Sequence, residues 1–491
     1  MATSGCSKVE SETPPCYRPP ALFGPQARKR LLWILLSLAL VQALLVVGAP
    51  RDEARAQTGP PNIVVILTDD QRSDSLGWMP KLRSSLLHRG MRLRSAVVSN
   101  PICCPSRASI LTGRYSHTTT VYTNSNLDPN GGWQRFNASG YESNTIATAL
   151  DGAGYRTGLF GKYMNGYAAA GEYVPPGWDR WFAVSSRSTH YYGYTMYDNV
   201  RGTLSFGHEP KDYQTDVIRH RAVSFVRSTP DDTPLFLYVT PFAPHSPSRP
   251  APRHIGDLAD TTVRLGPAVN EADVSDKPAY IQTQGTTPKD QLIDAMITYR
   301  ESLLAVDDMV GRLVQVLKDE GRLQNTVLLF TSDNGWSSRE HRWRGKLVPY
   351  EQSIRVPFIV RSDGEIPAGT ATTALASNID IAPTIAEFAG VPFPGADGVS
   401  MVPLLTDSAS SVRTSVLLEA VPIDRPVPVY CGVRTQSFVF VHYATGEEEL
   451  YDLASDPAQL RNIVQARPNK ANELRTLTQS LCQPVPPGFS W

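Results

Sequence analysis

Three aspartates and one asparagine offer oxygen ligands at two distant points of the chain. Asp69 and Asp70 directly follow one apolar run, and Asp333 and Asn334 follow another. Carboxylate and amide oxygens suit Ca²⁺ or Mg²⁺ better than Zn²⁺. Three carboxylates close together would repel one another unless a cation lay among them. The pattern predicts a metal site, although each pair alone is equally consistent with a helix N-cap or a hairpin turn.

A pair of adjacent cysteines begins the second chemical motif. Pro105 follows Cys103 and Cys104, and it suits the first turn of a helix that 108–112 can continue. The start of a helix carries partial positive charge, which stabilises an anion there. Adjacent cysteines rarely bridge each other and are too few for a structural zinc site. Two buried thiols and a reactive Cys103 are the open alternatives.

Three basic residues add candidate anion-binding groups. Lys162 and His245 each follow an apolar run, and Lys346 ends a basic stretch over 341–346. Taken alone, Lys162 is also consistent with a solvated loop lysine and His245 with a packed loop histidine. Lys346 is also consistent with a basic surface.

Short apolar runs are expected to position these residues. The runs predict strands buried on both faces, and each run is followed at once by polar residues. The runs are 62–67, 155–160, 235–239 and 326–330. Helical spacing over 289–320, followed by Gly321, predicts a long helix with a C-cap. Such alternation predicts an α/β fold, in which ligands collect where strands end.

The C-terminal part of the sequence has a different pattern, which predicts short strands and turns. Residues 430–443 alternate like a hairpin, 449–452 predict a further strand, and 470–481 predict a helix. We therefore expect a catalytic domain over 60–392 and an α+β subdomain with a small antiparallel sheet over 393–491. Outside the cytoplasm, Cys431 and Cys482 are the expected disulfide pair.

Bulk composition excludes some partners and the N-terminus predicts export. The 491 residues include 47 basic and 47 acidic side chains, so nucleic acid and electrostatic membrane binding are not expected. A basic flank at 28–30, an apolar run over 31–48 and an A-x-A site at 54–56 resemble a secretory signal. We interpret 1–56 as a signal peptide or, alternatively, as an uncleaved signal anchor. Either way the protein is secreted or extracytoplasmic, with no stable membrane contact if the leader is cleaved.

The cysteine motif closely resembles the signature of the type I, formylglycine-dependent sulfatase family. The signature is Cys103-x-Pro105-Ser106-Arg107, continued by Ser109-x-Leu111-Thr112-Gly113-Arg114. Further family-like stretches are Thr68-Asp69-Asp70-Gln71, Gly161-Lys162, Pro244-His245, Ser332-Asp333-Asn334-Gly335, Gly345-Lys346 and Arg355-Val356-Pro357. The resemblance covers roughly residue 61 to the C-terminus. It implies an alkaline-phosphatase-like sandwich, with a large central mixed sheet flanked by helices.

The resemblance also implies a role for each candidate residue. A separate formylglycine-generating enzyme would oxidise Cys103 to an aldehyde, whose hydrate attacks sulfur and later expels sulfate. Arg107 would hold that hydrate, and Lys162, His245 and Lys346 would bind the sulfate oxygens. His245 or Lys346 would protonate the leaving alcohol. The metal, usually Ca²⁺ with Mg²⁺ or Mn²⁺ as alternatives, would be held by Asp69, Asp70, Cys103, Asp333 and Asn334.

One departure from the family pattern narrows the substrate. Many members have a histidine two residues after the lysine, where this chain has Met164 followed by Asn165. Residues 162–165 resemble instead the branch of N-acetylglucosamine-6-sulfatases and extracellular endosulfatases. The resemblance favours a sulfated sugar such as a glycosaminoglycan unit, and leaves the general base unassigned.

Alternatives to this interpretation come from two classes. An aryl sulfatase, or a phosphonate monoester or phosphodiester hydrolase, would share the fold and the cysteine signature. An inactive glycan-binding protein would lack oxidised Cys103, although a complete set of metal ligands beside a nucleophile argues against it.

Overall fold

The computed structural model describes residues 59–491, except 126–127, 187–189 and 424. The predicted leader over 1–56 lies outside the described residues. Within the described part of the chain, no helix is both long enough and apolar enough to cross a membrane.

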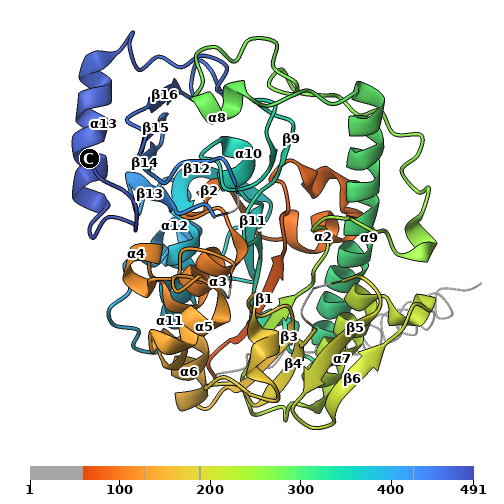
Figure 1. Cartoon of the computed structure of the whole chain (residues 1–491). Coiled ribbons are helices and arrows are strands. Elements are labelled where there is room, and N and C mark those ends of the chain that lie inside the picture. Colours follow the sequence, from red (N-terminus) through yellow and green to blue (C-terminus); the bar gives the residue numbers. More distant parts are fainter. Residues whose placement is uncertain (1–58, 126–127, 187–189, 424) are drawn as a thin grey trace, which may run out of the picture. The chain divides into compact units, whose positions relative to one another are not determined.

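A ten-stranded mixed sheet runs through the centre (Figure 1). Its middle strands, β8, β1, β7, β3 and β4, are parallel, and antiparallel neighbours join on both sides. In spatial order the strands are β12 (Thr370–Ser377), β2 (Met91–Val97), β11 (Phe358–Ser362), β8 (Thr326–Ser332), β1 (Asn62–Thr68), β7 (Leu235–Thr240), β3 (Arg156–Gly161), β4 (Arg180–Val184), β5 (Tyr194–Asp198) and β6 (Gly202–Phe206).

Helices cover both faces of this sheet, because its central strands carry apolar side chains on both sides. Ile63, Val65 and Leu67 of β1 belong to the core shared with α3, α6 and α11. Val64 and Ile66 point the other way, into the core shared with α7 and α9. The covering helices are α3 (Cys103–Thr112), α6 (Ile146–Gly152), α11 (Ile381–Ala389), α7 (Gln214–Ser228) and α9 (Lys289–Asp319). Shorter helices lie in the connections: α2 (Pro80–Leu82), α4 (Ser116–Thr119), α5 (Gly132–Ala138), α8 (Ala279–Gln282), α10 (Glu351–Ile354) and α12 (Val402–Thr406).

The predicted fold class is confirmed, and so are the elements on which it depended. The four apolar runs are β1, β3, β7 and β8, and the long predicted helix is α9. Gly321 follows α9 with a φ of 67°, the left-handed conformation that suits a C-cap. The outer strands β4, β5 and β6 were not predicted. Strand β6 has no fully buried residue, so it lacks the continuous apolar run that marks a central strand.

A four-stranded antiparallel sheet forms the C-terminal part. Val433, Phe440 and Leu450 on one face pack against Ala471 and Leu474 of α13 (Pro468–Leu481). The opposite face packs against the segment around α10, so it supports the loop that carries the candidate Lys346. The strands, in order, are β13 (Ser415–Ala420), β14 (Tyr430–Thr435), β15 (Phe438–Tyr443) and β16 (Glu448–Asp452).

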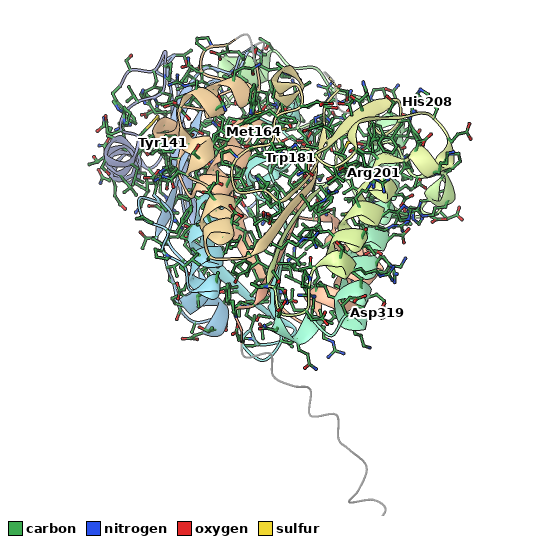
Figure 2. The ribbon with its side chains drawn as sticks, turned by 90° about the horizontal axis from the view of Figure 1, so that it is seen from below. Tyr141, Met164, Trp181, Arg201, His208 and Asp319 are labelled. Atoms are coloured by element: carbon green, nitrogen blue, oxygen red, sulfur yellow. A yellow bond between two sulfur atoms is a disulfide. The ribbon has the colours of Figure 1, made fainter. Side chains whose placement is uncertain are left out.

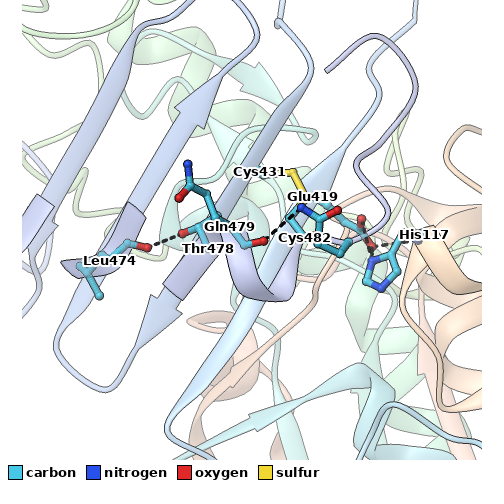
Figure 3. Close-up of a disulfide and its surroundings, with 8 residues drawn as sticks. His117, Glu419, Cys431, Leu474, Thr478, Gln479 and Cys482 are labelled. Atoms are coloured by element: carbon cyan, nitrogen blue, oxygen red, sulfur yellow. Dashed lines mark hydrogen bonds and ion pairs between the residues drawn. A yellow bond between two sulfur atoms is a disulfide. The ribbon is translucent and has the colours of Figure 1, made fainter. Parts of the chain in front are cut away.

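A disulfide ties the end of α13 to this sheet. Cys431 of β14 and Cys482 are bonded across a sequence separation of 51, as predicted (Figure 3). Beside it, His117 Nδ1 lies 3.2 Å from Glu419 of β13. This histidine joins α4 to the small sheet.

Candidate functional site

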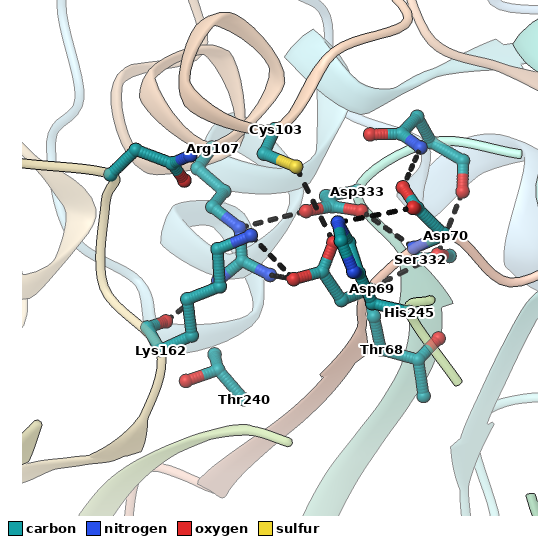
Figure 4. Close-up of polar contacts among 12 residues, drawn as sticks. Thr68, Asp69, Asp70, Cys103, Arg107, Lys162, Thr240, His245, Ser332 and Asp333 are labelled. Atoms are coloured by element: carbon teal, nitrogen blue, oxygen red, sulfur yellow. Dashed lines mark hydrogen bonds and ion pairs between the residues drawn. The ribbon is translucent and has the colours of Figure 1, made fainter. Parts of the chain in front are cut away.

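The register between β1 and β8 brings the two acidic pairs together. Thr68 at the end of β1 lies opposite Ser332 at the end of β8 in a parallel ladder, so the residues that follow leave the sheet side by side. The Asp70 N–H donates to Asp333 Oδ1 at 3.2 Å. Asn334 Nδ2 donates to Asp70 Oδ1 at 2.5 Å. Figure 4 shows Asp70 and Asp333 facing each other at this edge.

Cys103 is the first residue of α3, and its buried thiol lies among these carboxylates. The thiol donates to Asp69 Oδ1 at 3.4 Å and accepts from Lys346 Nζ at 2.8 Å. Burial, together with the charge of Asp69, raises the pKa of the Cys103 thiol to about 12. The unmodified thiol is therefore protonated at neutral pH and is a poor nucleophile.

Cys104 occupies a different environment from its neighbour. It belongs to the apolar core between α3 and the sheet, where its Sγ accepts from the Asn165 N–H at 3.1 Å. Burial raises the pKa of the Cys104 thiol to about 11. Both cysteines are free, so the structure distinguishes a core thiol from one that faces the polar site.

Arg107 lies one helical turn after Cys103 and links α3 to the sheet. Its Nε donates to Asp333 Oδ2 at 2.8 Å, and its Nη1 donates to the Lys162 carbonyl at 2.6 Å. Burial disfavours the charged guanidinium and would lower its pKa. The negative charges of Asp333 and Asp69 outweigh burial and raise the pKa of Arg107. Its Nη2 is buried and makes no hydrogen bond within the described part of the chain, so one donor is left for a further acceptor.

Lys162 and Lys346 place two ammonium groups against the aspartates. Lys162 Nζ lies 2.5 Å from Asp69 Oδ2, and Lys346 Nζ lies 2.5 Å from Asp70 Oδ1. Burial alone would lower the pKa of each lysine, but the carboxylates outweigh it and raise both pKa values. Both side chains therefore carry positive charge at the mouth of the site.

His245 follows β7 and faces the same carboxylates. Its Nε2 lies 3.4 Å from Asp70 Oδ2, and its ring stacks on Phe242 with centroids 4.5 Å apart. Its Nδ1 lies 2.7 Å from the Ser246 carbonyl, which can only accept, so Nδ1 carries the proton. Nε2 is therefore the nitrogen that can exchange a proton with a ligand.

A strained loop over 339–347 positions Lys346. It follows β9 (Ser337–Ser338) and contains β10 (Arg344–Gly345), which pairs with β9 in a two-stranded sheet. Left-handed backbone costs about 1–3 kcal/mol per residue and persists only where the surroundings fix it. Buried His341 supplies one such restraint, because its Nδ1 lies 2.6 Å from Glu271 Oε2. Four non-glycine residues of the loop have positive φ: Arg339 (78°), His341 (50°), Arg342 (60°) and Leu347 (76°).

The donor atoms suit a hard divalent cation. Asp69, Asp70, Cys103 and His245 can each offer one ligand atom, and these atoms all lie within 4.8 Å of one another. Asp70 Oδ2 and Asn334 Oδ1 are buried and accept no hydrogen bond from the described residues. Buried oxygens without donors are the groups that a cation would satisfy.

Asp333 lies outside that group of four, and its carboxylate accepts from Arg107 and from the Asp70 N–H. Burial and the charge of Asp69 raise the pKa of Asp333, since two carboxylates this close are costly to ionise together. A cation at this edge of the sheet would reduce that cost. The residues present therefore fit a metal site, and the assignment of individual ligands stays a prediction.

The residues after Lys162 provide no evident base beside Cys103. Met164 is buried in the same apolar core as Trp181 (Figure 2). Asn165 lines a cavity of about 370 Å³ together with Lys162 and His245. A second cavity, of about 400 Å³, is lined by Asp70, Trp336 and Arg344 among others. Ser246 and Pro247 line both cavities, so the charged cluster borders two adjacent spaces.

One supporting residue was not identified from the sequence. The Tyr299 hydroxyl accepts from the Arg72 N–H at 2.7 Å and donates to the Asp70 carbonyl at 3.0 Å. It thereby fixes the backbone that carries Asp70, whose φ is 64°. Its position in the apolar pattern of α9 indicates core packing, and nothing in that pattern reveals the role of its hydroxyl.

Comparison with known proteins identifies the class. A family model described as Sulfatase matches residues 61–391, and one described as N-sulphoglucosamine sulphohydrolase, C-terminal, matches residues 339–484. The N-acetylglucosamine-6-sulfatase of Homo sapiens is 33% identical over 481 residues, which cover 87% of this chain and 84% of that protein. The chain therefore belongs to the sulfatase family, a class of sulfuric ester hydrolases.

Further relatives extend the comparison. The extracellular sulfatase SULF-1 homolog of Drosophila melanogaster is 36% identical over 375 residues, or 74% of this chain, and the match spans only 33% of that protein. A solved structure in complex with its substrate D-glucosamine-2-N,6-O-disulfate has a TM-score of 0.74 at 24% identity, covering 87% of this chain and 99% of that one. The phosphonate monoester hydrolase of Agrobacterium radiobacter has a TM-score of 0.66 at 21% identity, covering 86% and 95%. At these identities, the two structural likenesses show a shared fold.

Proposed function

We propose that this chain hydrolyses a sulfate monoester on a sulfated amino sugar, such as N-acetylglucosamine 6-sulfate, to the alcohol and inorganic sulfate. One observation carries the proposal: the Cys103 thiol lies at the start of α3, within 3.4 Å of Asp69 Oδ1 and 2.8 Å of Lys346 Nζ. The named activities of the relatives support the substrate class.

The nucleophile in this proposal is residue 103 after its oxidation to formylglycine by a separate generating enzyme. The hydrated aldehyde supplies two hydroxyls on one carbon, so that one can attack sulfur and the other can later release the sulfate. Arg107 is placed to hold these hydroxyls, because its Nη2 lies on the same helix face one turn away; this atom is 3.7 Å from Asp69 Oδ2 and makes no hydrogen bond with the described residues. The pairing of Arg107 with Asp333 fixes the orientation of the guanidinium.

Asp69, Asp70, Asp333 and Asn334 would hold the metal with residue 103, and Ca²⁺ fits their oxygen donors best. A bound divalent ion supplies positive charge for the sulfate oxygens and lowers the pKa of a nearby hydroxyl. Lys162 and Lys346 add charge where negative charge develops on the sulfate. His245 Nε2 is placed to give a proton to the departing alcohol, while its Nδ1–H stays bonded to the Ser246 carbonyl.

The proposed location is outside the cytoplasm, as the predicted leader and the extracellular relatives suggest. In this proposal, residues 60–392 form the catalytic domain and residues 393–491 form the C-terminal subdomain.

Two measurements test the proposal. Sulfate release from a panel of sulfated sugars and aryl sulfates should favour a 6-sulfated glucosamine, and peptide mass spectrometry should show residue 103 as formylglycine. A persistent thiol at residue 103 in active enzyme would refute the mechanism. A phosphate diester hydrolysed faster than every sulfate ester would instead favour phosphodiester chemistry, the activity class suggested by the phosphonate hydrolase fold.

A further inference from the structure

A third cavity, of about 420 Å³, lies next to the proposed sulfate site. It shares Ser246, Trp336, Arg339 and Arg344 with the cavity that reaches Asp70. The two cavities therefore share a wall, and a ligand bound at Asp70 lies beside the third cavity. We name it the arginine cavity, and its lining residues include Gln284, Trp336, Arg339, Trp343, Arg344 and Arg425.

The arginine cavity carries positive charge that no acidic group of its lining neutralises. Its described lining residues include three arginines and no aspartate or glutamate. Arg344 is exposed and forms no ion pair with any residue that the structure describes. The chain as a whole has equal numbers of basic and acidic residues, so this concentration of charge is local.

Among the residues that the structure describes, Arg339 has only neutral hydrogen-bond partners. Its Nε donates to Thr287 Oγ1 at 2.7 Å, and its Nη1 donates to the Arg342 carbonyl at 3.0 Å. Burial and, to a smaller extent, the nearby positive charge of Arg344 lower the pKa of Arg339, and like charges on two arginines that line one cavity repel each other. An oxyanion between them would relieve that repulsion, and guanidinium groups bind such oxyanions with paired N–H donors.

The loop over 339–347 carries two of the three arginines, Arg339 and Arg344, and the catalytic candidate Lys346. Arg344 and Lys346 flank Gly345 on β10. The Trp343 indole N–H donates to the Lys346 carbonyl at 3.0 Å, so one wall of the arginine cavity also positions the lysine. The rings of Trp336 and Trp343 lie about 4 Å from the position that a Cβ on Gly345 would take. Trp343 is buried, and the partly exposed Trp336 gives this wall an aromatic side chain beside charged groups, which suits a sugar ring bearing an anion.

We infer that the arginine cavity binds a second anionic group of the substrate, a sulfate or carboxylate on the same or the adjoining sugar. This inference rests on the proposed function, because it places the reacting sulfate at Asp70, Cys103 and Lys346. The preferred substrate would then be a multiply charged glycan rather than a sugar with one sulfate.

The test compares singly and doubly charged substrates in Arg344→Glu, with Arg201→Glu as the matched control. Arg201 is an exposed arginine in the turn between β5 and β6 (Figure 2). The substrates are N-acetylglucosamine 6-sulfate, D-glucosamine-2-N,6-O-disulfate, and disaccharides that join a 6-sulfated glucosamine to a uronate or to a sulfated sugar without a carboxylate. The last two substrates distinguish carboxylate from sulfate as the second anion.

The wild type should have a higher kcat/KM for the doubly charged substrates. Arg344→Glu should lower that value by at least about tenfold, chiefly through KM, and should lower it by a much smaller factor for the singly charged sugar. If Arg344→Glu and Arg201→Glu keep the same fraction of the wild-type kcat/KM on every substrate, the inference is wrong. It is also wrong if Arg344→Glu loses kcat/KM by the same factor on all substrates.

Failure of the proposed function gives a different result, because wild type would then release sulfate from none of these compounds. Calorimetric titration of the disulfated sugar into wild type and Arg344→Glu would in that case test the arginine cavity directly. Equal affinities in the two proteins would reject it, and weaker binding in the variant would support it.

Discussion

At the scale of single residues, the candidate chemistry depends on how differently two adjacent cysteines are placed. Cys103 meets Asp69 and Lys346, whereas Cys104 faces the apolar core and accepts a backbone N–H. Their sequence positions differ by one, yet the first turn of α3 directs one side chain to the polar site and the other to the core. Substitutions at these two positions should therefore have different consequences.

Cys103→Ser should fold normally and lose turnover by more than about 10³-fold, because serine cannot be converted to an aldehyde by thiol oxidation and carries only one hydroxyl. Some of the variant should retain sulfate on Ser, visible as an added sulfonate mass in the intact protein. Cys104→Ser is the matched control. It should lower the free energy of unfolding by about 1–2 kcal/mol and keep most of the activity. Full sulfate release by Cys103→Ser would contradict the proposed mechanism.

Lys346 and His245 both face Asp70, and their roles can be separated by the leaving group. If Lys346 assists departure of the alcohol, Lys346→Ala should slow alkyl sulfates by about 10²–10⁴-fold. Activated aryl sulfates need little protonation, so the same variant should slow them much less. The measurement is kcat for a series of sulfate esters of graded alcohol pKa. Equal losses across the series would mean that Lys346 only binds sulfate and would leave His245 as the acid.

At the scale of elements, strand register explains most of the site. The parallel pairing of β1 with β8 places two acidic pairs side by side, and both strands are recognisable from their apolar runs. The loop over 339–347 is different, because its positive φ values depend on contacts with a segment around residue 271. Such a loop has no local sequence pattern, so the position of Lys346 could be inferred only through the family resemblance.

The contact between α13 and β16 gives a pH prediction at the same scale. Glu448 Oε2 lies 2.6 Å from Arg475 Nη2, and although burial raises the pKa of Glu448, the bonds with Arg475 and His442 lower it to about 2. A lowered folded-state pKa stabilises the fold above the unfolded value of about 4.5, and this contribution is lost as pH falls towards 2. Glu448→Gln should therefore cost about 1 kcal/mol at pH 7, after allowance for solvent screening.

The check is denaturant unfolding of wild type and Glu448→Gln from pH 7 down to pH 3. The difference between them should narrow below pH 4.5. Glu473→Gln is the control, since its pair with Lys470 on the same helix is more exposed. A difference that stays constant across this range would show that Glu448 contributes through packing rather than charge.

At the scale of the whole molecule, the structural features that could be predicted are those marked by a recognisable pattern in the sequence. Central strands, the long helix, the C-terminal hairpin and the disulfide each leave a local or compositional signal. The short strand β6 does not, because none of its residues is fully buried and it lacks a continuous apolar run. Strands β4 and β5 are mostly buried, but they are only five residues long, and a short buried run does not by itself distinguish a strand from a helix. The arginine cavity also escaped prediction, since Arg339, Arg344 and Arg425 gather only through folding. In the sequence, the basic stretch over 341–346 is also consistent with a solvated surface.

The proposed metal links the whole molecule, because its ligands come from the ends of β1 and β8 and the start of α3. Ca²⁺ that binds only the folded state should raise Tm by a few degrees, since a ligand at 100 times its Kd adds about 2.7 kcal/mol. Chelation should reverse this shift and abolish sulfate release. Asp70→Asn should lose the Ca²⁺-dependent shift, because it removes a charge from the buried oxygens that accept no hydrogen bond. Asp319→Asn, at the exposed end of α9, should keep it. An identical shift in both variants would place the ion elsewhere, and no shift in wild type would remove it from the proposal.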